Sequence, residues 1–155
     1  MTVTITRRIP PQRLIDAINP VVRGLAGSRL HGLVDDQVLI LHVTGRRTGR
    51  RYDIPVGFAD LGDELLVVTQ HRWRTNLRGG SDVTVTHHGR TTPMTAVVTE
   101  EPAAVAATLA RAVERIGRAQ AQRRFGLTLP DGYGPEDLEA AVREYALATI
   151  TLRTP

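Results

Sequence analysis

The stretch VTGRRTGRRY, residues 43–52, is the part of this chain on which the predicted fold depends. An apolar run, VLILHV at 38–43, leads into it, and a mostly alternating run, YDIPVGF at 52–58, leads out. Two runs with strand character joined by a short segment that contains glycine are typical of a β-hairpin. The sequence therefore predicts a hairpin whose tip carries the side chains of Arg46, Arg47, Arg50 and Arg51.

This tip has two interpretations. Glycine permits positive φ, so successive backbone N–H groups can turn into one concavity that binds an anion. Guanidinium forks add bidentate bonds to phosphate or carboxylate, and Thr48 adds a hydroxyl donor. Four cations crowded onto one turn favour an anion receptor, and a solvated charged turn is the alternative.

The composition indicates a folded domain with an aliphatic core. The 155 residues suffice for a single domain, 1–155, and 41% are hydrophobic whereas only 4% are aromatic. The chain has no cysteine, and no lysine stands among its 20 Lys and Arg residues. Disulfides, thiolate nucleophiles, cysteine-based zinc sites, Schiff-base chemistry and a P-loop lysine are therefore excluded.

The charge balance permits an anionic partner. The net charge is +4 and the pI is near 10.5, which suits nucleic acid, an anionic membrane surface or a phosphorylated cofactor. Scarce aromatic rings argue against a platform that stacks single-stranded bases, so we expect no nucleic-acid partner. The N-terminus shows no apolar signal-peptide core, and no apolar run approaches the ~20 residues that span a bilayer. We therefore expect a cytoplasmic protein.

Hydrophobic periodicity divides the chain into a barrel core flanked by helices. In a helical N-terminal segment, 1–35, apolar residues recur at helical spacing over 11–26 and arginines flank them. Such a basic amphipathic helix either lies on an anionic membrane, giving a membrane-associated protein, or covers the core of its own domain. The barrel core, 37–99, is followed by a helical insertion, 102–145, and a closing strand, 146–152. These patterns predict an α+β fold, a small antiparallel barrel with N-terminal and C-terminal helices packed around it.

Turn residues separate the expected elements. Gly117 is a candidate break within the helical stretch 102–125. The expected elements are strands at 37–43, 52–59, 64–70, 82–88 and 92–99, a helical turn at 71–78, a loop at 127–135 and a helix at 135–145.

Other side chains outside the hairpin are candidates for a site. Trp73, the only tryptophan, either stacks, on a flat ligand or on a neighbouring guanidinium, or plugs the barrel end. We expect Asn76 to bond the nearby backbone. Tyr133, between two glycines in a loop, is a candidate proton donor to a substrate, and the catalytic residue is otherwise unknown. His87 and His88 are adjacent on an expected strand, so we expect opposite faces and no metal site.

Several motifs occur together at a characteristic spacing. The chain has TGRRTG at 44–49, Pro55, WRTNL at 73–77 and VTV at 83–85. This combination resembles the deazaflavin (F420)-dependent nitroreductase and quinone reductase family, whose pattern is T-G-R-[RK]-[ST]-G, a proline, a strand, W-x-x-N-L and a V-x-V strand. The resemblance extends over residues 39–96.

The resemblance implies a split β-barrel akin to that of the flavin-dependent pyridoxamine phosphate (PNP) oxidases. It also implies an oxidoreductase that transfers a hydride from reduced coenzyme F420 to a small-molecule acceptor, such as a quinone or nitroaromatic. The resemblance implies that one group of residues holds the phosphate and acidic tail: Arg46, Arg47, Thr48, Gly49, Arg50 and Arg51. A second group would lie near the ring: Thr69, Gln70, Trp73 and Asn76. Tyr52 and Pro55 are further candidates for cofactor binding.

Other functions are left open by the sequence. A related barrel that uses FMN, FAD or haem is one alternative. A non-enzymatic carrier of a lipid, quinone or cofactor is another, and a nucleic-acid-binding barrel is disfavoured by the few aromatic residues. The barrel edges and the N-terminal helix are both compatible with a homodimer.

Overall fold

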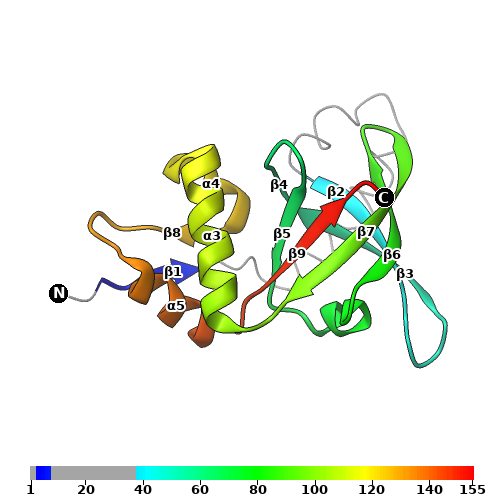
Figure 1. Ribbon diagram of the computed structural model, residues 1–155, viewed down its shortest axis with the longest axis horizontal. Coiled ribbons are helices and arrows are strands. Elements are labelled where there is room, and N and C mark those ends of the chain that lie inside the picture. The colour runs from blue at the N-terminus through cyan, green and yellow to red at the C-terminus, as the bar shows by residue number, and fades with distance from the viewer. Residues whose placement is uncertain (1–2, 8–37) are drawn as a thin grey trace.

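The structure, a computed structural model, describes residues 3–7 and 38–155 (Figure 1). The helix expected at 11–26 lies outside the described residues, and so do its two alternative roles on a membrane or on the core. Inside the expected helical segment 1–35, Thr6–Arg7 form a short strand, β1, instead of a helix.

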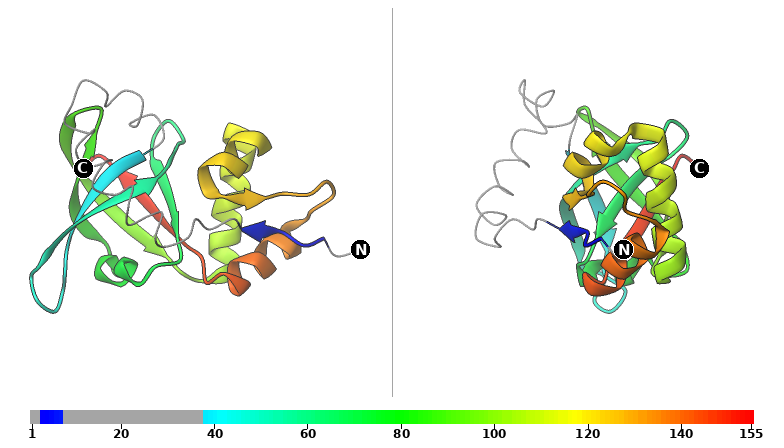
Figure 2. Two further views of the ribbon diagram at one scale, coloured as in Figure 1. Left: turned by 180° about the vertical axis from the view of Figure 1, so that it is seen from behind. Right: turned by 90° about the vertical axis from the view of Figure 1, so that its left-hand side faces the viewer.

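A seven-stranded sheet is the centre of the fold. Its strands are β2 Val38–Thr44, β3 Arg51–Gly57, β4 Ala59–Asp60, β5 Leu65–Thr69, β6 Ser81–His87, β7 Arg90–Thr99 and β9 Ala148–Arg153. They lie in the order β3-β2-β6-β7-β9-β5-β4, and every neighbouring pair is antiparallel. The sheet curls until β3 approaches β5, which makes half a barrel (Figure 1, Figure 2). The expected α+β fold with a split antiparallel barrel is confirmed.

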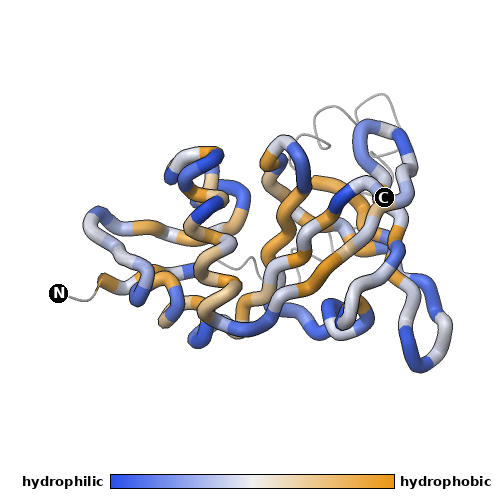
Figure 3. Tube along the Cα trace, viewed as in Figure 1, coloured by the Kyte–Doolittle hydropathy of each residue, from blue (hydrophilic) through white to orange (hydrophobic). Residues whose placement is uncertain are grey.

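The alternation within β2 shows which face of the sheet is the interior. Leu39, Leu41 and Val43 are at most 1% exposed, and because successive strand residues point to opposite faces they lie on one side. Figure 3 shows apolar residues along the strands and a hydrophilic tip on the β2–β3 hairpin. The interior cluster that these three residues join is Phe58, Val67, Leu77, Val83, Val85, Ala96, Ile150 and Leu152.

A second apolar cluster lies beside the sheet, where the helices gather (Figure 1). Its elements are α3 Pro102–Ile116, α4 Arg118–Phe125, β8 Leu127–Thr128 and α5 Pro135–Glu144. The carboxylate of Glu101 caps α3 by accepting from the amides of Ala103 (3.1 Å) and Ala104 (2.7 Å). Gly117, at φ 87°, separates α3 from α4, so the break within 102–125 is confirmed.

Two expectations near turns are wrong. The loop expected at 127–135 begins as β8, because β1 supplies a pairing partner from far away in the sequence. The fifth strand of the barrel begins at Arg90, because His88 and Gly89 form a two-residue turn with φ values of 52° and 71°. His88 thereby leaves the strand, and its ring centroid lies 4.0 Å from that of His87 instead of on the opposite face.

The β2–β3 hairpin and a 3₁₀ helix, η1 (Arg72–Leu77), meet at one end of the sheet. The hairpin predicted from residues 43–52 is present, and its turn extends beyond the sheet (Figure 1). The helical turn expected at 71–78 is present as η1, which contacts both β2 and β7. The junction of these two segments is where the candidate site forms.

We expect Leu41→Ala to lower the free energy of unfolding by about 2–5 kcal/mol, because it leaves a cavity at a fully buried position. Val97→Ala is the matched control, since Val97 is 48% exposed on β7 and its truncation leaves no enclosed cavity. Urea unfolding followed by circular dichroism measures both. Similar losses in the two variants would contradict the assignment of the sheet interior.

Candidate functional site

Backbone hydrogen bonds close the turn at residues 45–50. The amide of Gly45 donates to the carbonyl oxygen of Arg50 (2.7 Å), and the amide of Gly49 donates to that of Gly45 (2.9 Å). A Cβ on Gly45 would lie 3.1 Å from the Tyr52 ring, and Gly49 has a φ of 70°. Both positions therefore favour glycine, one for space and one for backbone conformation.

Four amides of this turn are hydrogen-bonded within the protein. The Arg46 amide donates to Asn76 Oδ1 (3.1 Å), and the Arg50 amide donates to Thr48 Oγ1 (3.2 Å). The two glycine amides are bonded to carbonyl groups of the same turn. These four amides are therefore not available to the anion-binding concavity expected from the glycines, and that concavity stays a prediction for the rest of the turn.

Asn76 joins the hairpin to η1. Its Oδ1 accepts from the Arg46 amide, and its Nδ2 donates to the carbonyl oxygen of Trp73 (3.0 Å). Nη2 of Arg46 also donates to the carbonyl oxygen of Arg78, directly after η1. The expected bond of Asn76 to the nearby backbone is thus present, and its bond to the hairpin is an addition.

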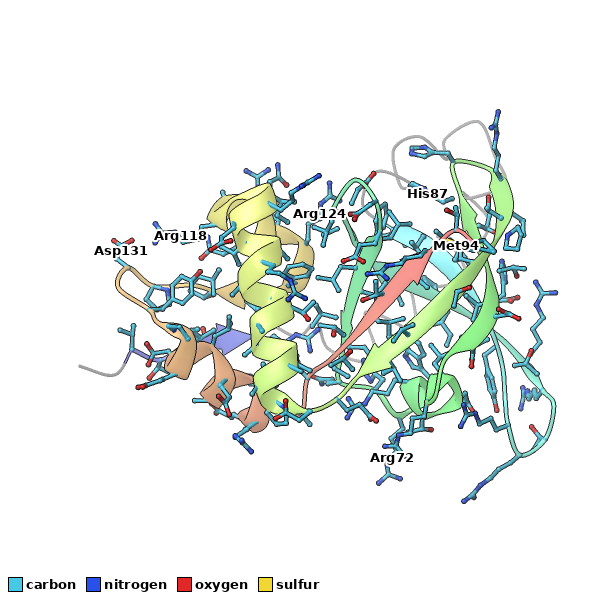
Figure 4. The ribbon with its side chains drawn as sticks, in the orientation of Figure 1. Arg72, His87, Met94, Arg118, Arg124 and Asp131 are labelled. Atoms are coloured by element: carbon cyan, nitrogen blue, oxygen red, sulfur yellow. The ribbon has the colours of Figure 1, made fainter. Side chains whose placement is uncertain are left out.

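A cleft of about 650 Å³ lies where the hairpin and η1 meet. Its volume falls in the range of roughly 300–1,000 Å³ that is typical of small-molecule sites. Five arginines and no carboxylate are among the described residues that line it. Figure 4 shows Arg72 extending away from the sheet. The lining consists of Arg46, Arg47, Arg72, Arg74, Thr75, Asn76 and Arg78.

Glu100, directly after β7, supplies a counter-charge behind this lining. Its Oε1 accepts from Arg74 Nε (3.0 Å) and Arg78 Nη2 (3.1 Å), and its Oε2 accepts from Arg78 Nε (2.7 Å). The bond from Arg78 lowers the pKa of the Glu100 carboxyl against the opposing effect of burial, and Arg74 lowers it further. The same bond raises the pKa of Arg78.

Arg74 and Arg78 differ in their freedom to move. Nη1 of Arg74 donates to the carbonyl oxygens of Ala146 (2.8 Å) and Thr69 (3.4 Å), and this side chain is 16% exposed. The side chain of Arg78 is 57% exposed, and Glu100 is its partner among the described residues. Arg74 therefore ties η1 to the sheet, whereas Arg78 is held by one carboxylate.

Arg50 and Arg51 have other partners. The guanidinium carbon of Arg50 lies 5.7 Å from the centroid of the Tyr52 ring. Nε of Arg51 donates to Asp53 Oδ1 (3.3 Å). Neither arginine belongs to the described lining of the cleft, so the hairpin tip supplies Arg46 and Arg47 to it.

The residues predicted near a cofactor ring flank the start of η1. Thr69 is buried, and its Oγ1 accepts from the His71 amide (3.1 Å). The Oε1 atom of Gln70 accepts from Arg7 Nη1 (3.2 Å). Trp73 packs against the interior cluster of the barrel, which is one of the two roles left open for it. Contact of these residues with a ligand stays a prediction.

Pro55 and Tyr133 lie outside the described lining of the cleft. Pro55 sits opposite Ile40 on the edge strand β3. Tyr133 packs against the apolar cluster of the helices. Figure 4 shows Asp131, two residues earlier, on the far side of those helices from the hairpin. The structure does not bring the candidate proton donor Tyr133 to the arginines.

Five residues of this site were not predicted from the sequence. Arg72, Arg74 and Arg78 recur within and just after η1, with Thr75 between them, a signal that is visible in the sequence. Glu100 has no local signal, because it is 22 to 26 residues from the arginines that it contacts. Only the path of β7 back past η1 brings this carboxylate into place.

His42 forms a separate polar network across four strands. Its Nδ1 lies 2.6 Å from Asp53 Oδ1, and its Nε2 lies 2.7 Å from Thr86 Oγ1. Thr86 Oγ1 lies in turn 3.0 Å from Thr91 Oγ1. The bond with His42 lowers the pKa of the Asp53 carboxyl against a smaller opposing effect of burial, and Arg51 lowers it further. We assign this network to the stability of the sheet.

Comparison with known proteins assigns the chain to a family. The sequence model of the family described as F420H(2)-dependent quinone reductase matches residues 13–129, which is more than half of the chain. This chain belongs to that family. At the family level it is therefore an oxidoreductase of the F420-dependent quinone reductase type.

Solved structures resemble the fold at low sequence identity. One, described as a domain-swapped dimer, is 14% identical, covers 93% of this chain and 100% of its own, and has a TM-score of 0.47. The FAD and haem binding protein from Mycobacterium smegmatis is 18% identical, with 83% of this chain and 67% of its own covered and a TM-score of 0.46. No curated protein matches the chain.

Residues 3–7 and 38–155 lack two structural features. In this part of the chain, no helix has both the length and the apolar character needed to span a membrane. The same residues contain no group of three or more His, Cys, Asp or Glu side chains placed to hold a metal ion.

We expect Asp53→Asn to destabilise the protein at neutral pH and to have little effect in strong acid. The folded pKa of Asp53 is lowered, so its ionised form stabilises the fold above the unfolded value of about 3.9. This contribution is lost as the pH falls through the lowered folded pKa. Urea unfolding over a pH series measures it, with Asp82→Asn, an exposed carboxylate on β6, as control. A loss independent of pH, or equal in both variants, would contradict the network.

Proposed function

We propose that this protein transfers a hydride from reduced coenzyme F420 to a quinone, a nitroaromatic or a similar electron-poor acceptor. The observation that carries the proposal is the cleft between the hairpin and η1, which is lined by five arginines. Membership of the F420H(2)-dependent quinone reductase family supports the same coenzyme and the same class of acceptor.

The cleft suits the acidic end of this coenzyme. The coenzyme carries a phosphate and an acidic tail, and guanidinium forks bind the oxygens of both groups. Of the five arginines, Arg74 and Arg78 are paired with Glu100. Arg47 and Arg72 make no ion pair with any residue that the structure describes, so their charge is available to a ligand.

The residues of the cleft would have different roles in binding. Arg46, Arg47 and Arg72 would hold phosphate and carboxylate oxygens, and the Thr75 hydroxyl adds a neutral donor. Asn76 would fix the distance between the two segments through its bonds to the hairpin and to η1. When bound, the coenzyme supplies the carbon that donates the hydride, and the protein supplies binding, orientation and electrostatic field.

The rest of the hairpin would contribute around the cleft. Thr48 and Gly49 keep the turn closed through their hydrogen bonds. Arg50 and Arg51 would extend the basic surface beside it, which attracts an anionic ligand at longer range, and the Tyr52 ring would support the guanidinium of Arg50.

The residues at the end of β5 and the start of η1 would face the ring. Thr69, Gln70 and Trp73 adjoin the arginines of η1 in the sequence, which supports proposing them as neighbours of a ligand whose tail lies in the cleft. Pro55, on the neighbouring edge strand, is the remaining candidate. These positions are assigned by their place in the fold and by the family resemblance.

FMN and FAD also carry phosphate, so the cleft accommodates their acidic ends as well. Parallel titrations with oxidised F420, FMN, FAD and haem distinguish the cofactors, because each has its own absorbance. We expect F420 to bind more tightly than the other three. Tighter binding of a flavin or of haem would reassign the cofactor while leaving the cleft as its anchor.

Arg47→Ala and Arg72→Ala should each weaken binding of oxidised F420 by about tenfold to a hundredfold. Each variant removes hydrogen bonds from a charged donor, which contribute about 1.5–3 kcal/mol apiece. Arg143→Ala is the matched control, because Arg143 is exposed on α5 and pairs with Glu139. Fluorescence titration at fixed ionic strength measures the affinity, and thermal unfolding verifies the fold. Unchanged affinity in both cleft variants would refute the assignment.

The hydride-transfer step has its own test. Stopped-flow mixing of the protein and reduced F420 with menadione or a nitroaromatic should show oxidation of the coenzyme above the rate without protein. The dependence of this rate on acceptor identity then ranks the acceptors. Tight coenzyme binding without accelerated oxidation would favour the non-enzymatic carrier over the reductase.

A further inference from the structure

Glu100 is the acidic partner of the cleft arginines, and it approaches them from outside the described lining. It lies directly after β7, whereas Arg74 and Arg78 belong to η1 and the residue after it. Its two oxygens take three hydrogen bonds, of 2.7, 3.0 and 3.1 Å, from the two guanidinium groups. The carboxylate thus neutralises part of the positive charge that the cleft would otherwise offer to a ligand.

The two arginines would respond differently to the loss of this carboxylate. Arg74 is also fixed by the carbonyl oxygens of Thr69 and Ala146, so it stays in place without Glu100. Arg78 has no such second anchor among the described residues, and its side chain is 57% exposed. Release of Glu100 therefore frees the guanidinium of Arg78 for a ligand.

From this asymmetry we infer that Glu100 is a specificity-determining residue. Its carboxylate competes with the ligand for Arg78 and thereby limits how many acidic groups of a ligand the cleft binds. The inference rests on the proposed function, because it concerns the acidic end of the same ligand. The ligand class affected is the polyanion with several phosphate or carboxylate groups. A ligand with a single acidic group would bind to Arg46, Arg47 and Arg72, which make no hydrogen bond with Glu100.

The strength of the Glu100–Arg78 pair fits a tuning role. The side chain of Arg78 is 57% exposed, so its two bonds to Glu100 are in contact with water. A ligand carboxylate can replace Glu100 as the acceptor of these two bonds, while Glu100 keeps its bond from Arg74. The depressed pKa of Glu100 keeps the carboxylate ionised from neutral to mildly acidic pH, so the competition operates throughout that range.

The test is a double-mutant cycle on the full chain with inorganic anions as probes. Binding of tripolyphosphate and of orthophosphate is measured by calorimetry at fixed low ionic strength for the wild type, Glu100→Gln, Arg78→Gln and the double variant. Glu64→Gln is the matched control, since Glu64 pairs with Arg153 (2.7 Å) at the opposite end of β5 and its loss changes the net charge equally.

Glu100→Gln should bind tripolyphosphate about threefold to tenfold more tightly than the wild type, with a smaller gain for orthophosphate. Arg78→Gln in the double variant should abolish this gain, and Glu64→Gln should stay within about twofold of the wild type. Weaker or unchanged binding by Glu100→Gln would overturn the inference. So would an equal gain in Glu64→Gln, or a gain that survives the loss of Arg78.

A second test compares Arg78→Gln with Arg47→Gln, so it does not require that Glu100→Gln folds. Because Glu100 already neutralises Arg78, Arg78→Gln alone should weaken tripolyphosphate binding less than Arg47→Gln does. Equal losses in these two variants would overturn the inference. The probes contain no redox ring, so failure to bind or oxidise F420 would reject the proposed function and leave this result standing.

Discussion

Asn76 is the constraint on which the candidate site depends. Its side-chain amide holds the Arg46 amide on one side and the Trp73 carbonyl on the other, across 30 residues of sequence. A second link joins the same two segments, because Nη2 of Arg46 donates to the carbonyl oxygen of Arg78. The close approach of the chain at Gly45 also matters, because a Cβ there would lie 3.1 Å from the Tyr52 ring and require that ring to shift. The side chains of Asn76 and Arg46 therefore hold the two segments of the cleft together.

Like charges at such a junction repel one another, and the structure reduces this repulsion only in part. Glu100 accepts from Arg74 and Arg78, but Arg47 and Arg72 are unpaired within the described region. The sheet network at His42 shows the opposite arrangement, because Asp53 and Thr86 satisfy both ring nitrogens. Unpaired positive charge is thus concentrated at the cleft, whereas the polar groups of the His42 network are hydrogen-bonded. Unpaired positive charge favours binding of an anion, but it does not favour stability of the fold. This excess of positive charge is confined to the surface at one end of the sheet.

The fold was largely predictable because its signals are local. The apolar run of β2, the turn at residues 44–51 and the glycine at 117 each specify a conformation through nearby residues. β8 was missed because a two-residue strand exists only through its partner β1. The site was predicted less well, because it too depends on contacts between segments that are distant in the sequence. The arginine tip is visible in the sequence, but the bonding of its amides, the contribution of η1 and the position of Glu100 depend on contacts between distant segments.

The arginines of the cleft do not by themselves determine which cofactor it binds. Guanidinium groups bind phosphate and carboxylate oxygens whatever lies beyond them, so Arg46, Arg47 and Arg72 supply affinity that a deazaflavin, FMN or FAD would share. Interactions common to competing ligands cannot discriminate between them, because specificity is a difference of affinities. In the proposed function, discrimination of the ring falls to the neutral side chains at the end of β5 and the start of η1. Thr69 is buried and Trp73 packs against the interior cluster, so both side chains are restricted in position, and such restriction would favour one ring shape over another.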